Sequence, residues 1–545
     1  MGAKPFALNV GLCCLFLPLV SACATTQEVV RASPIFDILI ENGTVYDGSG
    51  APGAAASIAI IGDKIVSIES DNPENPQAKR RIDATGLIVA PGFIDPHTHL
   101  VEDLGSEDRK RRNNAPYLTQ GVTTVVLGND GYGDYYIKPM ARLLAELGTG
   151  TNMAFMVGFG PVRRELLADT NRAPTDDELE QMKGFVARGM CDGAVGFSTG
   201  LYYTPQNFAE TDEVVALASV AGDLGGIYDS HIRDESSYNI GLRAAVEEAL
   251  YIGREADMPV HIAHIKALGP AVWGASSDIV AMVEKAQAAG QIVTADQYPW
   301  QASGTRISNA LVPRWALDGG LDGLRARLTN AEERARIVEG MAKGLKRRGG
   351  ADALLFTGAL GEADVPKGIT LAEYAQQKNI DPLDAALEIL AAGDSRVASF
   401  NMDEADIATF ARQPWVVTSS DGSTGHPRKY ASFPKAYQRF VKRDRLFDMA
   451  RYIHRSSGMT AELLGLERRG FVRAGYFADI VVFDPERFEA VADYQDPEEL
   501  SQGVRYLLVN GELAIDGGAI SGALAGRPLL KDTSKYAAQC QQTDG

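Results

Sequence analysis

The chain has 545 residues and a formal net charge of −18, with 45% hydrophobic and 23% charged residues. This composition is typical of a globular protein, and the length predicts a large core and two domains. The acidic balance disfavours nucleic acid and anionic membrane surfaces as partners. The short basic runs at residues 109–112 and 346–348 are therefore interpreted as solvated helix faces.

The first 22 residues are predicted to be a signal peptide, because one Lys precedes an apolar run that is too short to span a membrane comfortably. The sequence "VSAC", which ends at Cys23, resembles the lipobox of bacterial lipoproteins. That resemblance implies cleavage before Cys23, a lipid on its sulfur, a linker over residues 23–34 and membrane contact only through this anchor. The alternative is ordinary cleavage after Ala22, which gives a soluble periplasmic protein.

The cysteines give little further information. Cys13 and Cys14 leave with the predicted signal peptide, so that Cys191 and Cys540 remain beside Cys23. A single pair so far apart in sequence does not form a recognisable disulfide framework. Nothing in the spacing predicts a cysteine-based metal site.

Both ends of the mature chain are predicted to be β-rich. "FDILIENGTVYDGSG" and "ASIAIIGDKIVSIES" alternate apolar and polar residues and break at turn residues, and "YLLVNGELAIDGG" does the same near the C-terminus. Neither set makes a stable sheet alone. We expect residues 35–90 and 468–530 to form one small β-sandwich together.

The middle of the chain alternates short apolar strands with helical patterns. The strands are "GLIVAPGFIDPHTH", "VTTVVLGND", "MAFMVGFG", "GAVGFSTGLYY", "GIYDSHI", "PVHIAHIK", "IVTADQYPW" and "WVVTSSDG". One helix start is marked by a capping box, "TDDE", at residues 175–178. The pattern predicts a (β/α)8 barrel over residues 91–467. Residues 307–400 exceed one βα unit and are interpreted as an insertion that can cover the barrel mouth.

Polar residues of metal-binding types follow these strands. His97 and His99 are two apart, so on a strand both face the same side and can converge on one ion. His231 ends another strand, and Asp421 ends the last, where a carboxylate can bind metal and move a proton. Imidazole and carboxylate ligands suit Zn²⁺, with Mn²⁺, Co²⁺ or Fe²⁺ as alternatives.

The strand "PVHIAHIK" carries two further histidines. His264 and Lys266 are two residues apart, so they lie on the same side of a strand, and we expect both to face the barrel lumen. His261 has the opposite parity and is expected to face the helices as a hydrogen-bonded core histidine.

At this point the sequence resembles the metal-dependent amidohydrolases, and among them the N-acyl-D-amino-acid deacylases. The resemblance covers nearly the whole mature chain and rests on "ENGTVYDGSG", "IDATGLIVAPGFIDPHTH", "GVTTVVLGN", "GFSTGLYYTP", "SHIRDE", "IAHIK", "TADQYPW" and "SSDG…HPR". It implies that His97 and His99 hold a more exposed metal ion and that His231 and His264 hold a tighter one. Asp421 is then the proton shuttle.

Asp130, in "VVLGNDGYG", occupies the position of a cysteine ligand in the D-aminoacylases that the chain resembles. Two histidines and one carboxylate still form a catalytic zinc set with an open position for water. A harder oxygen ligand favours Mn²⁺ or Co²⁺ more than sulfur does. The alternative is that Asp130 only caps the turn.

The resemblance also implies a clamp for the substrate carboxylate, formed by Tyr203, Lys266, Tyr298 and Arg428. For Tyr298 the alternative role is packing, and the resemblance implies no role for His426.

The function that the resemblance implies is hydrolysis of the amide of N-acyl-D-amino acids. A dipeptidase or cyclic-amide hydrolase on the same barrel is the second hypothesis, although no Lys ends "GAVGFSTGLYY", as the cyclic-amide branch requires. A catalytically inactive binding lipoprotein is the third.

Overall fold

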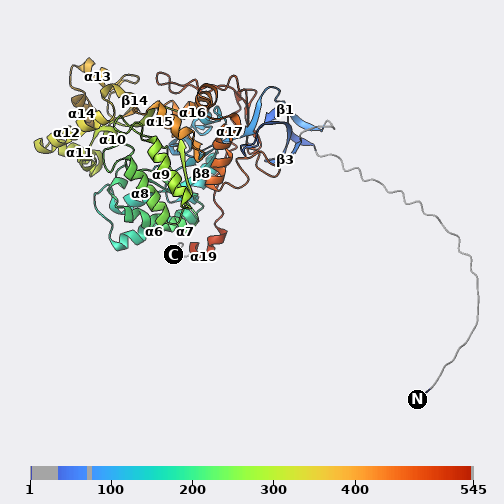
Figure 1. Cartoon of the computed structure of the whole chain (residues 1–545), viewed down its shortest axis with the longest axis horizontal. Coiled ribbons are helices and arrows are strands. Elements are labelled where there is room, and N and C mark those ends of the chain that lie inside the picture. The colour runs from blue at the N-terminus through green and yellow to red at the C-terminus, as the bar shows by residue number, and fades with distance from the viewer. Residues whose placement is uncertain (1, 3–34, 70–75, 542–545) are drawn as a thin grey trace, which may run out of the picture.

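The computed structural model describes residue 2, residues 35–69 and residues 76–541 (Figure 1). The predicted signal peptide, its cleavage site and Cys23 lie outside the described residues. Among the helices of the described part of the chain, none has both the length and the apolar composition needed to span a membrane.

Eight parallel strands form the barrel, in the spatial order β16-β12-β11-β10-β9-β8-β7-β6. They are β6 (Phe93–Asp95), β7 (Val122–Leu127), β8 (Asn152–Gly158), β9 (Gly196–Gly200), β10 (Ile227–His231), β11 (Val260–Ile262), β12 (Val293–Gln297) and β16 (Val416–Thr418). All their residues are buried except Thr294, which is half-buried, as expected for a parallel sheet covered on both faces. A bridge between Thr98 and Gly422 joins the two outermost strands, so that the barrel is nearly closed. The predicted barrel is confirmed, except that only Phe93–Asp95 of the first predicted strand belongs to it, because the preceding residues Ile88–Pro91 form a strand of a second sheet.

Helices surround this barrel. They are α4 (Ile137–Leu147), α5 (Phe159–Leu167), α6 (Asp176–Cys191), α7 (Thr211–Asp223), α8 (Leu242–Glu255), α9 (Ser276–Ala288), α15 (Glu404–Ala411), α16 (Arg428–Ala436), α17 (Met449–Ser456) and α18 (Gly458–Leu464), with the short α1 (Val101–Leu104), α2 (Arg109–Arg112), α3 (Ala115–Leu118), η1 (Gln206–Phe208) and η4 (Tyr437–Arg443). The capping box at the start of α6 is confirmed: Glu178 N–H donates to Thr175 Oγ1, and Thr175 N–H donates to the Glu178 carboxylate.

The two ends of the chain build a second, nine-stranded sheet beside the barrel (Figure 1). Its strands are β1 (Phe36–Val45), β2 (Ala54–Ile61), β3 (Lys64–Glu69), β4 (Ala78–Asp83), β5 (Ile88–Pro91), β17 (Ile480–Phe483), β18 (Val504–Val509), β19 (Glu512–Asp516) and β20 (Ala519–Ile520). Antiparallel pairing of β5 with β17 joins the N-terminal and C-terminal parts. Ile58, Ile480 and Leu508 belong to a buried core of its own. Both terminal segments thus complete one β domain.

The long segment between β12 and β16 forms a separate layer of helices and strands. It contains β13 (Ala302–Arg306), α10 (Ile307–Leu311), η2 (Arg314–Leu317), α11 (Gly320–Leu328), α12 (Ala331–Arg347), η3 (Ala351–Ala353), β14 (Leu354–Gly361), α13 (Leu371–Lys378), α14 (Pro382–Ala392) and β15 (Gly393–Phe400). β15 pairs antiparallel with both β13 and β14, and the segment has its own apolar core. Its charged helical pattern predicted helices but not this three-stranded sheet.

A disulfide joins Cys191, at the end of α6, to Cys540 in α19 (Ala537–Cys540), which follows η5 (Ser534–Tyr536). The tail before it runs along the amino ends of the barrel strands: Met153 N–H donates to the Arg527 carbonyl, and Leu529 N–H donates to the Met153 carbonyl. α19 lies beside α6 (Figure 1). The sequence spacing gave no sign of this bond, because the tail brings together residues 349 positions apart.

Candidate metal centre

The polar residues that follow the barrel strands meet at one end of the barrel. His97 and His99 follow β6, Asp130 follows β7 and His231 ends β10. His264 lies beyond β11, and Asp421 lies beyond β16. All are buried except His99, which is half-buried. The structure therefore brings together the whole ligand set that the sequence predicted, at the carboxyl ends of the strands where barrel enzymes hold their active sites.

The carboxylate of Asp130 lies at the centre of this cluster. Its Oδ1 is 3.3 Å from His97 Nε2, 3.3 Å from His264 Nε2 and 3.5 Å from His231 Nδ1. Its Oδ2 is 3.5 Å from His99 Nε2. Ring nitrogens of four histidines thus face one carboxylate.

Asp130 is shared by two groups of possible ligands. One group joins it to His231 and His264, whose Nδ1 and Nε2 atoms are 2.8 Å apart. The other joins it to His97, His99 and Asp421, and His99 Nε2 lies 3.2 Å from Asp421 Oδ1. Within each group the possible ligand atoms lie within 4.8 Å of one another. The sequence placed Asp130 only with His231 and His264, whereas the structure places it between both groups.

The donor atoms of this cluster fit a divalent cation. His97 Nε2 and Asp130 Oδ1 are buried and have no hydrogen-bond partner. Buried polar atoms without a partner are costly, and coordination of a metal ion is one way in which proteins satisfy them. Nitrogen and carboxylate oxygen are ligands that Zn²⁺, Mn²⁺ and Co²⁺ accept. The described residues therefore include a site suited to one ion or two.

Three residues of the cluster have a strained backbone conformation. Asp130, His264 and Asp421 have φ values of 56°, 35° and 48°, in the left-handed region that residues with side chains rarely adopt. Such strain persists only where surrounding contacts fix it, and it is common at functional sites. Here Gln206 Nε2–H donates to the Asp130 carbonyl at 3.0 Å. A Cβ added at the next residue, Gly131, would come within 2.0 Å of Gln206 Oε1.

The groups around Asp130 keep its carboxylate negatively charged, as a ligand of a cation has to be. Burial tends to raise the pKa of Asp130, but the charges of His97, His231 and His264 lower it well below its ordinary value. Burial disfavours a charge on His97, yet Asp130 and Asp296 raise its pKa well above the ordinary value. The anionic carboxylate is thus stable only with positive charge beside it.

Asp421 is held by Arg428 as well as by His99. Arg428 Nη1 is 2.6 Å from Asp421 Oδ2, and Arg428 Nη2–H donates to Oδ1 at 2.9 Å. Burial favours the neutral acid, but the charges of Arg428 and His264 lower the pKa of Asp421 below its ordinary value. This ion pair and its hydrogen bond keep the carboxylate of Asp421 charged and oriented.

The residues predicted to clamp a substrate carboxylate lie around the same cluster. The Tyr203 ring is 4.7 Å from the His231 ring. Lys266 Nζ and Arg428 Cζ lie 5.6 Å and 5.1 Å from the Tyr298 ring centroid, and the buried Tyr298 hydroxyl has no partner. The substrate-binding roles remain predictions, because Arg428 is already paired with Asp421 and Lys266 is ion-paired with another carboxylate.

That other carboxylate is Glu235, which sequence reasoning missed. Glu235 Oε1 pairs with Lys266 Nζ and lies 3.2 Å from His264 Nδ1. Burial tends to raise the pKa of Glu235, but the charge of Lys266 leads a set of cations that lowers it. Its position four residues after His231 in "SHIRDE" was a signal that could have found it.

Asp296 on β12 is a second carboxylate that the sequence analysis missed. Its Oδ2 lies 3.6 Å from His97 Nδ1 and 3.0 Å from His261 Nε2, and His261 Nδ1 is 2.8 Å from Thr294 Oγ1. A carboxylate on the far nitrogen of a ligand histidine orients its ring and raises its basicity.

His261 is hydrogen-bonded, as expected. The side of the strand on which it lies was predicted wrongly, because Val260 and Ile262, not His261, face the helices. Val260 and Ile262 pack in the main apolar core with helix residues such as Val246. The regular strand ends at Ile262, and the left-handed turn at His264 then redirects the chain to the barrel mouth.

His426, for which the sequence gave no role, joins the last loop to the insertion. Its Nε2 lies 3.2 Å from the Ala302 carbonyl, and its Nδ1 accepts a hydrogen bond from Arg428 N–H at 3.1 Å. Burial and the charge of Arg428 lower its pKa well below the ordinary value, which favours the neutral ring. It positions Arg428.

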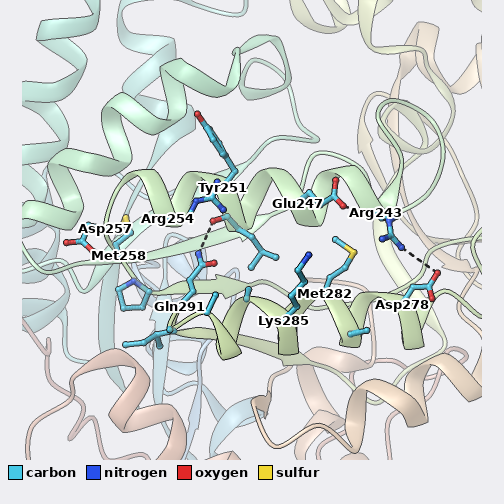
Figure 2. A pocket seen from close by; sticks show the side chains of 18 residues that line it. Arg243, Glu247, Tyr251, Arg254, Asp257, Met258, Asp278, Met282, Lys285 and Gln291 are labelled. Atoms are coloured by element: carbon cyan, nitrogen blue, oxygen red, sulfur yellow. Dashed lines mark hydrogen bonds and ion pairs between the residues drawn. The ribbon is translucent and has the colours of Figure 1, made fainter.

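A separate groove of about 970 Å³ lies on the outer surface between α8 and α9 (Figure 2). Its lining includes Arg243, Tyr251, Met282 and Lys285, and it contains none of the clustered histidines or carboxylates described above. The candidate site is therefore the polar cluster at the barrel mouth.

Comparison with known proteins agrees with this site. The model of the Amidohydrolase family matches residues 375–515. The D-aminoacylase of Alcaligenes xylosoxydans xylosoxydans is 32% identical, with 91% of this chain and 98% of that protein covered. The N-acyl-D-glutamate deacylase of the same organism is also 32% identical, with 91% and 97% covered. The chain therefore belongs to the D-aminoacylase family of amidohydrolases.

Solved structures show the same relationship. A crystal structure of D-aminoacylase superposes with a TM-score of 0.77 at 30% identity, covering 91% of this chain and 100% of that one. The N-acyl-D-glutamate deacylase of Bordetella bronchiseptica, complexed with zinc and a phosphonate inhibitor, gives a TM-score of 0.76 at 28% identity, covering 91% and 100%. Another D-aminoacylase structure is described as having a binuclear metal center.

The first prediction separates a ligand role of Asp130 from turn capping. Asp130→Asn should lower metal content and turnover together, because an amide lacks the charge that offsets the cation. A turn cap replaced by Asn loses at most about 1 kcal/mol of stability. Metal per chain is measured with turnover on the same samples. The matched control is Asp134→Asn, since Asp134 caps the exposed Tyr136 N–H in the same loop. Equal metal and turnover in wild type and Asp130→Asn would leave Asp130 with a loop role only.

The second prediction concerns Asp296. Asp296→Asn keeps the size of the side chain but removes the charge beside His97 Nδ1, and loss of such an outer contact typically costs about 10- to 100-fold in metal affinity. Affinity is measured by competition with a chelator of known strength. Asp403→Asn, at the half-buried N-cap of α15, serves as control. An unchanged affinity in Asp296→Asn would mean that His97 is oriented by packing alone.

Proposed function

We propose that this chain is a metal-dependent amidohydrolase that cleaves the amide bond of N-acyl-D-amino acids, giving a carboxylate and a free D-amino acid. The observation that carries the proposal is the convergence of four histidines and Asp421 on Asp130, in a member of the D-aminoacylase family. The proposed ions are Zn²⁺, with one bound tightly and a second more weakly, and Mn²⁺ or Co²⁺ as substitutes.

When bound, a divalent ion would lower the pKa of a water molecule and polarise the scissile carbonyl. His97, His99, His231, His264 and Asp130 would hold it, with Asp421 adjacent. Asp421 accepts the proton of the attacking water at its carboxylate and later donates it to the leaving amine. Arg428 supports the first step, because its ion pair with Asp421 keeps that carboxylate ionised.

Recognition of the substrate is proposed to use the residues around Tyr298. The free carboxylate of the N-acyl-D-amino acid would lie near Lys266, Arg428 and the unpartnered Tyr298 hydroxyl. Tyr203, beside His231, would complete the clamp. Glu235 and Asp421 hold the two cations in position before the substrate arrives, which reduces the ordering needed on binding.

The third prediction tests this function. Purified protein loaded with Zn²⁺ should hydrolyse N-acetyl-D-amino acids and leave the L-enantiomers largely intact. Asp421→Asn should lower kcat by about 10²- to 10⁴-fold, the usual contribution of a general acid-base group. Asp448→Asn, at the N-cap of α17, is the matched control and should keep full activity. Equal rates for both enantiomers, or an active Asp421→Asn variant, would exclude the proposed reaction.

We also propose that the mature protein is exported and lipid-anchored through Cys23. The supporting observations are the lipobox-like "VSAC" after the apolar run and the Cys191–Cys540 disulfide, because disulfides persist mainly outside the reducing cytosol.

The fourth prediction concerns this anchor. Cys23→Ser should move the protein from the membrane fraction to the soluble fraction, because the thioether that carries the lipid no longer forms. Fractionation is followed by immunoblot, and intact mass shows the presence or absence of acyl chains. Cys540→Ser, which leaves the lipobox unchanged, should stay with the membrane. Identical fractionation of wild type and Cys23→Ser would refute lipid anchoring.

A further inference from the structure

Exposed apolar side chains lie on the hairpin of β2 and β3, where the described part of the β domain begins. Ile61 and Val66 are 38% and 39% exposed. Ile61 pairs with Lys64 across the hairpin, and Val66 is two residues from Lys64 on β3, so the three side chains share the outer face. Ile35, just before β1, is 55% exposed and lies beside the end of β2, because β1 and β2 are antiparallel neighbours.

Basic side chains adjoin this hairpin. Lys64 Nζ lies 2.8 Å from the centroid of the Phe477 ring, and Arg527 Nη1 lies 2.6 Å from the carboxylate of Asp63 in the hairpin turn. Arg468 is exposed. Burial and the charge of Arg468 lower the pKa of Lys64, while Asp63 opposes that change. The hairpin therefore has cations on the side that meets the C-terminal tail.

A groove of about 660 Å³ continues this surface from Phe477 and Arg527 to the C-terminal tail. Its lining includes Leu530, Lys531 and Lys535, of which Leu530 is 42% exposed and Lys535 is exposed. Neither lysine forms an ion pair with an acidic side chain of the described residues. We call this region the hairpin–tail surface, and its main residues are Ile61, Lys64, Val66, Leu530, Lys531 and Lys535.

The predicted lipid site lies close to the hairpin–tail surface along the chain. Cys23 precedes Ile35 by twelve residues, and an extended chain spans at most about 3.6 Å per residue. The surface is therefore held within about 40 Å of the membrane that carries the lipid. Figure 1 shows β1 and β3 at one end of the molecule and α13 and α14 of the insertion at the other. Membrane contact at the hairpin end leaves the insertion in solution.

The local charge of this surface differs in sign from that of the whole chain. Among the residues that line the groove, four are basic and two are acidic, although the chain has a net charge of −18. The Debye length is about 8 Å at physiological ionic strength, so acidic groups on remote faces contribute little repulsion. Cations that reach anionic headgroups attract them, and apolar side chains beside those cations enter the headgroup region.

We propose that the hairpin–tail surface docks on the anionic bilayer that holds the lipid anchor, so that the protein lies against the membrane in one orientation. The inference rests on the proposed anchor at Cys23 and adds a protein surface to it, whereas the sequence predicted contact through the anchor alone. A bilayer is favoured over a protein partner, because the short tether to the predicted lipid begins at this surface. A second copy of the chain is the competing occupant.

The test, our fifth prediction, uses the mature protein with Cys23→Ser, which carries no lipid. It is mixed with vesicles of three parts phosphatidylethanolamine to one part phosphatidylglycerol, and flotation measures the bound fraction. The protein should bind these vesicles. Its partition coefficient should be lower by about fivefold or more on phosphatidylcholine vesicles, since each basic residue near an anionic leaflet contributes about that factor. Light scattering gives the oligomeric state of the same sample.

Variants in the Cys23→Ser protein separate the apolar from the basic contribution. Ile61→Ser combined with Val66→Ser should lower the partition coefficient by about fivefold or more, because the apolar side chains are lost. Lys535→Glu should do the same on anionic vesicles only. The matched controls are Ile292→Ser, beside the groove between α8 and α9, and Lys346→Glu, on α12 of the insertion. All five positions are exposed, so the variants should fold normally, and the controls should bind as the parent does.

The outcomes separate docking from anchoring. If the Cys23→Ser protein binds neither kind of vesicle, or if the controls lower binding as much as the other variants do, the docking surface is wrong. The intact mass of the wild type decides the anchor independently. A dimer that Ile61→Ser with Val66→Ser dissociates would mean that the surface joins two copies, which overturns docking. A wild type without acyl chains refutes the anchor, and vesicle binding by the unlipidated protein then supports docking on its own.

Discussion

The carboxylate of Asp130 is buried among four imidazoles, and the rest of the site is arranged around it. Three of the histidine contacts converge on one oxygen, Oδ1, at 3.3 to 3.5 Å. Because an isolated buried carboxylate is strongly disfavoured, this geometry is stable only with positive charge among the ligands, supplied by protonated imidazole or by a metal ion. The left-handed backbone at Asp130, His264 and Asp421 is the conformational cost of directing those groups to one point.

A second set of residues keeps this cluster rigid. Asp296 lies beside Nδ1 of His97 and is ion-paired with His261. Arg428 forms an ion pair and a hydrogen bond with Asp421. Glu235 connects Lys266 with His264. His97, His264 and Asp421 therefore each meet a buried charged partner, and such networks fix orientation more strongly than isolated contacts do.

The barrel supplies the strand ends, but two other parts of the chain complete the molecule around it. The insertion from β13 to β15 brings arginines to the mouth and contacts Tyr202 and His426. At the opposite end of the strands, the C-terminal tail pairs with the start of β8 and is bonded to α6 through Cys191 and Cys540. Different segments of the chain therefore cover the two ends of the barrel. In barrel enzymes the carboxyl ends of the strands commonly carry the catalytic residues, and the amino ends contribute to stability.

The sequence by itself determined the barrel, the shared terminal sheet and the candidate ligands, because strand periodicity, turn residues and His or Asp at strand ends are local signals. It also indicated His97, His99, His231, His264 and Asp421 as one set through the resemblance of their motifs. Only the tertiary structure decided that Asp130 lies between both ligand groups, that β11 ends before His264, and that Asp296 and Glu235 hold the ligands. It alone joined Cys191 to Cys540 and placed Arg314 against Tyr202. These contacts connect segments far apart in the chain, and their pairing depends on how the strands and the insertion pack in space, which no local pattern encodes.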